Sequence, residues 1–274
     1  MNTKTSQFRK LLHKGLVIMP GAFNAYSALL IEQAGFSAYY ISGAGLANAV
    51  FGVPDIGIPT LPEAAEHARR IDQTVSIPGI SDADTGFENI SATIKTFEAS
   101  GVAGIHLEDQ QTDKRCGHLE GKKLISAKEM GKKIEKAITT KKDKNFLVIA
   151  RTDAAAVEGF DAALKRAKLY EDAGADAIFT EALTSEKEFA AFRQAIKIPL
   201  LANMTEFGKT PYLSIKKFEA LGMNMVIFPM TLFRVAAKSM QQALVELKQK
   251  GTQKGILEKM QTRQELYKLL KYNP

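Results

Sequence analysis

The residues best suited to chemistry lie in one short segment, Lys114-Arg115-Cys116-Gly117-His118, which contains the only cysteine of the 274 residues. Basic neighbours favour the thiolate form of a cysteine, and glycine lets a ligand approach the main chain closely. The segment therefore suits a thiol that exchanges a proton with an anionic substrate. A loop cysteine without a chemical role explains the pattern equally well. A structural zinc site is disfavoured, because no second Cys/His pair supplies the remaining ligands.

Two carboxylates follow an apolar run in the segment Asp82-Ala83-Asp84-Thr85-Gly86. At the two-residue period of a strand, both carboxylates would point to the same side. Neighbouring carboxylates favour a bound cation, and oxygen ligands suit Mg²⁺, with Mn²⁺ also possible. Asp55 and Glu108 could add ligands or hold metal-bound water. The alternative is a turn rich in aspartate that caps the next helix.

Groups that could bind an anion follow other apolar runs. Ser42-Gly43-Ala44-Gly45 offers main-chain amides to a carboxylate or phosphate, with an ordinary tight turn as the alternative. Arginine binds carboxylates through two parallel hydrogen bonds. The candidates for contact with substrate anions are therefore Arg151, Asn203, Thr205 and Arg234. By contrast, we expect His67 and His106 to be structural, since His106 lies within an apolar run.

The composition indicates a globular enzyme more than a nucleic-acid or membrane protein. The chain is 45% hydrophobic and 24% charged, with a formal net charge of +7. A basic chain can bind nucleic acid, but these lysines are scattered and no aromatic residues interleave with them. No segment reaches the roughly 18 apolar residues that span a membrane. The single cysteine and the lack of a secretory signal predict a cytoplasmic protein.

Apolar runs alternate with helical patterns along the chain. Strands are predicted at 16–19, 38–42, 80–82, 104–108, 146–151, 177–181, 199–203 and 225–229. Helices are predicted between them at 25–34, 62–73, 91–99, 128–139, 160–173 and 185–196. This order predicts an α/β fold, a (β/α)8 TIM-type barrel, with an open doubly wound sheet as the alternative. The barrel is favoured because most of the strands end in polar residues, as active-site strands of barrels do.

Glycines and a long C-terminal region complete the pattern. Gly35, Gly101, Gly174 and Gly222 each follow a predicted helix, where glycine adopts the left-handed conformation that ends a helix. Further helices are predicted at 231–248 and 255–270. We expect one domain over 1–274, with 250–274 as a helical extension that packs on a neighbouring subunit or over the barrel mouth.

Several motifs together resemble the isocitrate lyase and phosphoenolpyruvate mutase superfamily, over nearly the whole chain. The cysteine segment is typical of the lyase branch, since mutases and hydrolases of the superfamily generally lack it, although it does not separate one lyase from another. Within that branch the chain most resembles the 2-methylisocitrate lyases, because isocitrate lyases proper are considerably longer. Besides the segments already quoted, the motifs are Glu108-Asp109-Gln110, Ala150-Arg151-Thr152-Asp153-Ala154, Phe179-Thr180-Glu181-Ala182, Ala202-Asn203-Met204-Thr205-Glu206-Phe207-Gly208 and Met260-Gln261-Thr262-Arg263-Gln264-Glu265-Leu266-Tyr267. One departure is Glu88-Asn89, where the family usually has a glycine and a longer loop.

The resemblance implies a Mg²⁺-dependent site and a homotetramer that exchanges its C-terminal helices between subunits. Carried onto this sequence, it implies that Asp82 and Asp84 hold the metal with Asp55 and Glu108 nearby. The substrate contacts that it implies are Ser42, Gly43, Ala44, Cys116, Gly117, Arg151, Glu181, Asn203, Met204, Thr205, Arg234 and Arg263.

The activity implied is cleavage of a small tricarboxylate, 2-methylisocitrate, to pyruvate and succinate in the methylcitrate cycle of propionate catabolism. Cys116 would protonate the departing succinate carbanion, His118 would tune that thiol, and Tyr40 is the predicted general base. Phe179 and Ile227 would surround the substrate methyl group. The alternatives are a lyase acting on isocitrate or dimethylmalate, an oxaloacetate hydrolase, and a nucleic-acid-binding protein without catalytic activity.

Overall fold

The computed structural model describes residues 3–112, 114, 117 and 121–273. Its centre is a closed barrel of parallel strands, in which each strand pairs with the next and β1 pairs with β8. The strands are β1 Val17–Ala22, β2 Tyr39–Ile41, β3 Gly79–Asp82, β4 Gly104–Glu108, β5 Leu147–Thr152, β6 Ala177–Thr180, β7 Leu200–Asn203 and β8 Met225–Phe228. The predicted (β/α)8 barrel is therefore confirmed, and the open sheet is wrong.

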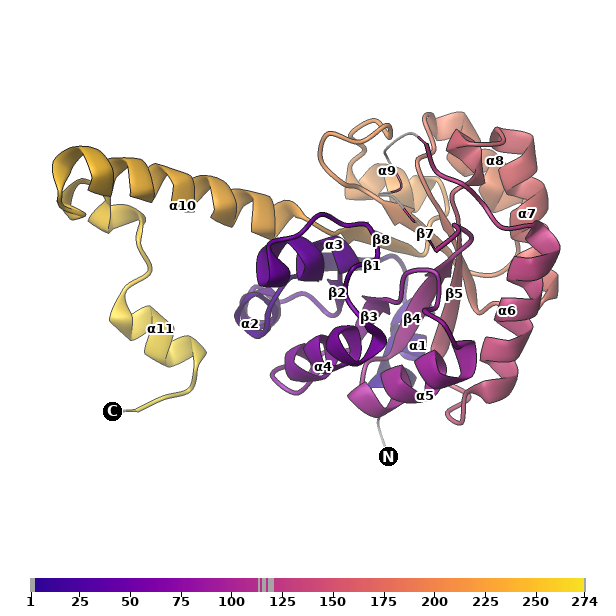
Figure 1. Ribbon diagram of the computed structural model, residues 1–274, viewed down its shortest axis with the longest axis horizontal. Coiled ribbons are helices and arrows are strands. Elements are labelled where there is room, and N and C mark those ends of the chain that lie inside the picture. Colours follow the sequence, from indigo (N-terminus) through magenta and orange to yellow (C-terminus); the bar gives the residue numbers. More distant parts are fainter. Residues whose placement is uncertain (1–2, 113, 115–116, 118–120, 274) are drawn as a thin grey trace.

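Helices follow the strands and cover the outside of the barrel (Figure 1). The helices that cover the barrel are α2 Ala25–Gln33, α4 Leu61–Asp72, α5 Ile90–Ser100, α6 Ala127–Thr140, α7 Phe160–Asp172, α8 Glu186–Ala195 and α9 Ile215–Ala220. Short helical turns are inserted after β2 and β5: α3 Gly43–Gly45, η1 Leu46–Phe51 and η2 Ala154–Ala156. All of the helices that the sequence predicted between the strands are present.

The four glycines predicted to end helices do so. Gly35, Gly101, Gly174 and Gly222 have φ values of +84°, +96°, +92° and +74°. Only glycine adopts this left-handed conformation without a steric penalty. Each one therefore turns the chain from a helix back toward the barrel, which fixes the direction of the following strand.

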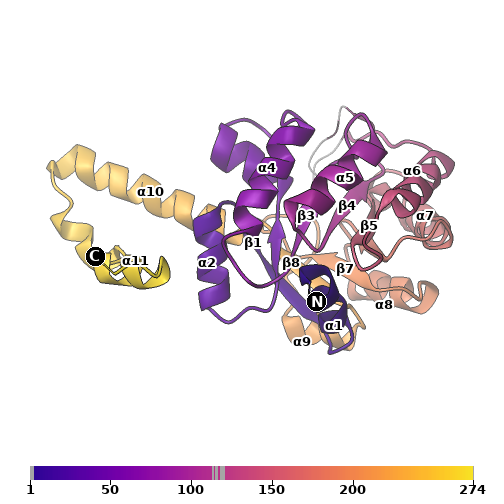
Figure 2. The same cartoon turned by 90° about the horizontal axis from the view of Figure 1, so that it is seen from below.

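The apolar core has two layers, one between the barrel and its helices and one inside the barrel. The inner layer includes Phe8, which is fully buried although it comes from the N-terminal helix α1 Lys4–Leu12. Figure 2 shows α1 at the end of the barrel where the strands begin. The sequence pattern had not predicted this helix. It closes the bottom of the barrel, so the opposite end is left for a site.

The C-terminal region leaves the barrel along α10 Thr231–Lys250, which has no fully buried residue (Figure 1). The helix predicted at 255–270 is wrong as a single element. It consists of a 3-10 turn, η3 Lys254–Lys259, and a separate helix, α11 Arg263–Leu269. Thr262 and Glu265 form a capping box that starts a new helix, which explains the break. Helix α11 turns back to lie beside α2.

Among the described residues, no helix is both long enough and apolar enough to cross a membrane.

Candidate active site

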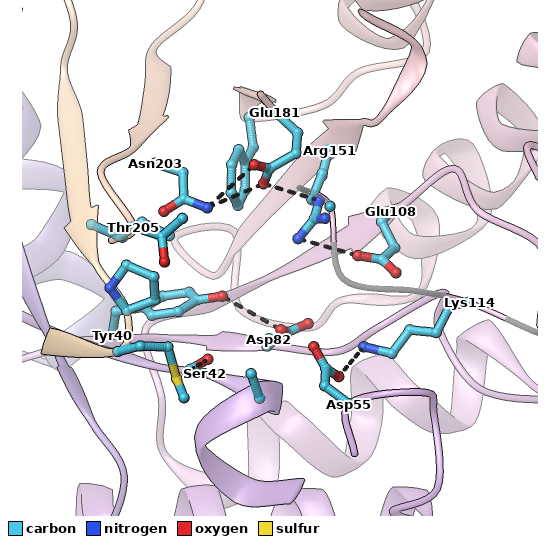
Figure 3. A pocket seen from close by; sticks show the side chains of 16 residues that line it. Tyr40, Ser42, Asp55, Asp82, Glu108, Lys114, Arg151, Glu181, Asn203 and Thr205 are labelled. Carbon is cyan, nitrogen blue, oxygen red and sulfur yellow. Dashed lines mark hydrogen bonds and ion pairs between the residues drawn. The ribbon is translucent and has the colours of Figure 1, made fainter. Parts of the chain in front are cut away.

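A pocket opens among the carboxyl ends of the strands, where barrel enzymes place their active sites (Figure 3). Most of the predicted site residues meet there, although they come from different strands. The pocket is lined by Tyr40, Ser42, Ala44, Asp55, Asp82, Glu108, Lys114, Gly117, Arg151, Phe179, Glu181, Asn203, Thr205, Ile227, Pro229 and Met230.

Arg151, near the carboxyl end of strand β5, is the central cation of the pocket. Its Nε and Nη2 donate to the two carboxylate oxygens of Asp153 at 2.9 and 3.1 Å. Nη1 lies 3.3 Å from Glu108, and Nε lies 3.5 Å from Glu181. The guanidinium carbon lies 5.1 Å from the centre of the Phe179 ring. Surrounded in this way, the guanidinium has one fixed orientation, which is what recognition of a substrate carboxylate requires.

The second group of charges lies where β3 ends. Asp82 Oδ1 accepts a hydrogen bond from the main chain of Asp84 at 2.9 Å, and Asp84 has a φ of +50°. A turn, and not the alternation of a strand, therefore brings the two carboxylates together. Both face Gly43, whose amide donates to Asp82 Oδ2 at 3.1 Å. A Cβ atom on Gly43 would lie 2.9 Å from Asp82 Oδ2 and 3.4 Å from Asp84 Oδ1, so a side chain at this position would push the Asp82 carboxylate aside.

Lys114 is the cation that these carboxylates share. Its ammonium group forms ion pairs with Asp84 and, at 2.8 Å, with Asp55. Burial raises the pKa of Asp84 to about 6, and the nearby charges of Asp82 and Asp55 add to this against the opposing effect of Lys114. Burial would lower the pKa of Lys114, but the surrounding carboxylates raise it well above its usual value. The ammonium group therefore stays charged.

The residues present fit a magnesium site that is completed by water and substrate, and not a metal site in which the protein supplies every ligand. Among the described residues, no three His, Cys, Asp or Glu side chains are grouped so as to bind a metal. Mg²⁺ usually takes one or two carboxylates and completes its shell with water and substrate oxygens. Burial raises the pKa of Glu108 well above its usual value, and within the described part of the chain Glu108 Oε1 has no hydrogen-bond partner. A divalent cation close to these buried carboxyl groups would favour their ionised form and give that oxygen a partner.

Tyr40 and His106 form a buried pair beside Asp82. Tyr40 Oη lies 2.8 Å from His106 Nε2, which is 3.4 Å from Asp82 Oδ1. Burial lowers the pKa of His106 to about 4, so the imidazole is neutral. Burial and the charge of Asp82 raise the pKa of Tyr40 well above its usual value. The role of Tyr40 as general base stays a prediction, and this pKa argues against it because the phenol keeps its proton at neutral pH.

Four described residues that were predicted to contact substrate are not among those that line the pocket. Gly43 lies beside it, where its amide donates to Asp82. The Met204 side chain packs in the core between barrel and helices, where its sulfur accepts a hydrogen bond from the Leu213 amide. Arg234 is half-exposed on α10, near Glu206 and over the ring of Phe207. Arg263 is exposed at the start of α11, away from the pocket of its own chain. Cys116 and His118 lie outside the described residues, so their predicted roles stay predictions.

Two buried lysines at the site, Lys114 and Lys122, were not predicted from the sequence as site residues. Lys114 was noted only as one of the basic neighbours that favour the thiolate form of Cys116. Lys122 drew no attention, yet its side chain is 1% exposed and its ammonium group lies 2.9 Å from Asp153. Lysine is almost never fully buried unless it is paired. The one available signal was the proximity of both residues in sequence to the cysteine motif.

Residues 8–248 match the family Phosphoenolpyruvate phosphomutase. A probable 2-methylisocitrate lyase 1 of Corynebacterium glutamicum is 52% identical over 258 residues, which cover 93% of this chain and 84% of the relative. The 2-methylisocitrate lyase of Aeropyrum pernix is 48% identical over 269 residues, covering 97% and 86%.

Solved structures share the fold of this chain. The crystal structure of 2,3-dimethylmalate lyase superposes with a TM-score of 0.93 at 35% identity, covering 98% of this chain and 92% of that one. The structure of phosphonopyruvate hydrolase in complex with oxalate and Mg²⁺ has a TM-score of 0.86 at 31% identity, covering 97% and 94%.

Proposed function

Since the chain belongs to the phosphoenolpyruvate mutase and isocitrate lyase superfamily and is a carbon–carbon lyase, we propose that it cleaves 2-methylisocitrate to pyruvate and succinate. The observation that carries this proposal is near-half identity to 2-methylisocitrate lyases over almost the whole chain. The pocket supports it, because Arg151 and Lys114 are placed to receive carboxylates and Phe179 gives an apolar wall.

In the proposed reaction, the C2 hydroxyl of the substrate transfers its proton to a general base, for which the phenolate form of Tyr40 is the predicted group, and the C2–C3 bond breaks. The electron pair on oxygen forms the keto group of pyruvate. The pair from the C2–C3 bond goes to C3, where the adjoining carboxylate delocalises it. Cys116 then transfers its thiol proton to C3 and completes succinate. Arg151 holds a substrate carboxylate through this sequence, while Asn203 and Thr205 offer hydrogen bonds from the end of β7.

We propose Mg²⁺ as the cofactor, held by Asp82 and Asp84 with Asp55 and Glu108 nearby. The surplus of buried carboxylates supports this, and so does the Mg²⁺ complex of a structural relative. When bound, the ion would polarise the hydroxyl and carboxylate oxygens of the substrate and stabilise negative charge. Mn²⁺ would satisfy the same oxygen ligands.

The direct test is pyruvate or other keto-acid release from 2-methylisocitrate, isocitrate and 2,3-dimethylmalate, with and without Mg²⁺. We expect the highest kcat/KM with 2-methylisocitrate and no turnover after EDTA until the metal is restored. A higher kcat/KM with 2,3-dimethylmalate would transfer the assignment to that activity, which the 35%-identical structure makes the second candidate. Full turnover after metal analysis confirms removal would overturn the metal proposal.

Cys116→Ser tests the proton donor in the same assay. A serine hydroxyl is far less acidic than a thiol, whose reference pKa is about 8.5. We expect turnover to be abolished, while the thermal midpoint and the binding of succinate are nearly unchanged. Cys116→Asp, which restores an acid of different geometry, serves as a comparison. Near-normal activity of the serine variant would refute the role of the thiol.

We also propose a homotetramer that exchanges its C-terminal helices. Helix α10 exposes Val235, Met240, Leu244, Val245 and Leu247, by 62%, 55%, 65%, 53% and 44%. An apolar face of this kind marks an interaction site. Exchange would also bring Arg263 close to the pocket of a neighbouring subunit.

Light scattering tests this assembly. The double variant Leu244→Glu/Val245→Glu should show smaller particles than the wild type, while Lys238→Glu serves as the control. An unchanged mass would contradict the proposal.

The biological role follows from the proposed substrate. We propose a cytoplasmic enzyme of the methylcitrate cycle in propionate catabolism. A strain without this chain should fail to grow on propionate while growing normally on glucose. Normal growth on propionate would contradict the role but leave the enzymatic assignment in place.

A further inference from the structure

Lys122 is a buried lysine for which the proposed reaction has no use. Its side chain is 1% exposed, and its ammonium group forms an ion pair with Asp153 Oδ1 at 2.9 Å. The same ammonium group donates a hydrogen bond to the carbonyl oxygen of Gly117. Burying a charge costs free energy unless partners compensate for it. Both partners of Lys122 border the active site, because Gly117 lines the pocket and Asp153 pairs with Arg151. We therefore consider what Lys122 does there.

The main chain that directly follows Lys122 is held independently of the Lys122 side chain. Gln110 and Leu124 form an antiparallel bridge. The amide of Gln111 donates to the Lys123 carbonyl at 2.9 Å, and the amide of Ile125 donates to the Asp109 carbonyl at 3.0 Å. The segment that bears Lys122 is therefore anchored to the end of β4. From this fixed base, the side chain reaches across to Gly117.

Asp153 connects Lys122 to the substrate-binding arginine. Its Oδ1 receives the Lys122 ammonium group and, at 3.1 Å, Arg151 Nη2; its Oδ2 receives Arg151 Nε at 2.9 Å. The main-chain amide of Asp153 donates to Asp109 Oδ1 at 2.9 Å, so the main chain that carries this carboxylate is also held. One buried carboxylate thus fixes both the guanidinium and the ammonium group.

Gly117 lies directly against the same arginine. A Cβ atom at this position would overlap Arg151 Nη2 and lie 2.6 Å from Glu181 Cγ, so the main chain can approach this closely only with glycine. Gly117 is also the residue that follows Cys116 in the sequence. Where its main chain is held therefore matters for the step that we assign to the thiol.

We propose that Lys122 is a positioning residue of the lyase, which ties the Gly117 main chain to the Asp153–Arg151 pair and so fixes Gly117 against the substrate-binding arginine. The proposal rests on the proposed function. Because Arg151 keeps both of its bonds to Asp153 without Lys122, substrate binding should survive the loss of the lysine. Alignment for turnover should not, since a displacement of about 1 Å can cost roughly 100-fold in rate.

The test compares Lys122→Met, which keeps the length of the side chain, with Lys122→Arg, which keeps the charge. We expect Lys122→Met to lower kcat by about 100-fold with KM changed less than about threefold, and Lys122→Arg to recover part of the loss. Lys128→Met, an exposed lysine on α6, should match the wild type. A kcat within threefold of the wild type in Lys122→Met would overturn the proposal. So would equal changes in kcat and KM that follow a lowered thermal midpoint.

Hydrogen exchange provides a readout that needs no substrate. In Lys122→Met, peptides that cover residues 111–124 should exchange faster than in the wild type, while peptides from the opposite end of the barrel are unchanged. Unchanged exchange would overturn the proposal. If the wild type cleaves none of the three acids, the proposed function fails, and the exchange comparison still decides whether Lys122 holds Gly117. Lys122→Gln replaces Lys122→Met if the latter does not fold.

Discussion

Single residues in this pocket have to satisfy packing and chemistry at the same time. Phe179 is an example, because its ring lies under the Arg151 guanidinium and packs edge-on against His106, with 5.2 Å between the ring centres. It is fully buried and lines the pocket together with Ile227. The ring therefore supports the arginine and also gives the apolar wall on which preference for a methylated substrate would depend.

We predict that Phe179→Thr narrows the preference for 2-methylisocitrate over isocitrate. One methyl group in an apolar pocket contributes about 1–3 kcal/mol, or roughly 10–200-fold in kcat/KM. The change should reduce kcat/KM for the methylated acid more than for isocitrate, whereas Phe179→Leu should keep most of the preference. The measurement is kcat/KM for both acids in all three proteins. An unchanged ratio in the threonine variant would place the methyl group elsewhere.

His67 on α4 is predicted to make the folded protein less stable in mild acid. Burial lowers its pKa to about 4 from a usual 6.5, and among the described residues its Nε2 has no hydrogen-bond partner. Between these values the unfolded chain binds the proton more tightly than the folded one, so stability falls as the pH drops from 6.5 to 4. The contribution is about 1–3 kcal/mol.

Urea unfolding of the wild type and of His67→Leu at pH 7 and pH 4.5 measures this contribution. The leucine variant should lose less stability between the two pH values, and His13→Leu, at the end of α1, serves as the control. An equal loss in the wild type and His67→Leu would show that His67 does not contribute.

At the scale of elements, the N-terminal helix α1 closes one end of the barrel. Phe8 inserts into the bottom of the barrel, and polar residues of the helix fasten it to the surrounding loops. Arg9 pairs with Asp176 at 2.6 Å, Lys4 pairs with Asp72 at 2.8 Å, and Thr5 donates to Asp143 at 2.6 Å. The helix closes the end of the barrel that carries no catalytic group.

Phe8→Ala should therefore destabilise the fold without disabling the site. Removal of a fully buried phenylalanine ring usually costs about 3–5 kcal/mol. Phe8→Leu, which leaves a smaller void, should cost less. Denaturant unfolding gives the free energies, and kcat measured well below the unfolding transition should stay near the wild-type value. A loss of kcat without a loss of stability would show that α1 influences the opposite end of the barrel.

The elements that the sequence predicted well are those fixed by local patterns. Buried parallel strands are short apolar runs, and glycines end helices, so both can be recognised along the chain. Helix α1 could not be predicted in this way, because a single phenylalanine entering the barrel leaves no periodic pattern. The break before α11 had a local signal, the capping box of Thr262 and Glu265, which the apolar pattern of 255–270 obscured.

The site residues that the sequence predicted are likewise those fixed by local patterns, and the ones it did not predict depend on tertiary contacts. The strand-end residues Arg151, Glu181 and Asn203 meet in the pocket because register alone brings them together. The closeness of Asp82 and Asp84 was predicted for the wrong reason, since a left-handed turn and not strand alternation places Asp84. Lys114 and Lys122 were not predicted as site residues, because lysine is normally solvated and only tertiary contacts bury it.

At the scale of the whole molecule, the C-terminal region links assembly to activity in the proposed tetramer. We predict that removal of residues 256–274 lowers the oligomeric mass and kcat together, because the deletion removes Arg263 and the helix beside α2. Light scattering and the lyase assay measure the two effects, and Lys268→Ala, an exposed change on α11, is the control. A truncated protein with wild-type mass and kcat would refute the prediction.

The pairing of β1 with β8 also has a consequence for synthesis on the ribosome. Val17 leaves the ribosome early, but its partner Met225 is made only near the end of the chain. Until then the growing polypeptide is an open sheet, with an unpaired edge at β1 that other chains could join. The barrel therefore closes only after most of the chain has been translated, and the interval before closure is when this protein would depend most on chaperones.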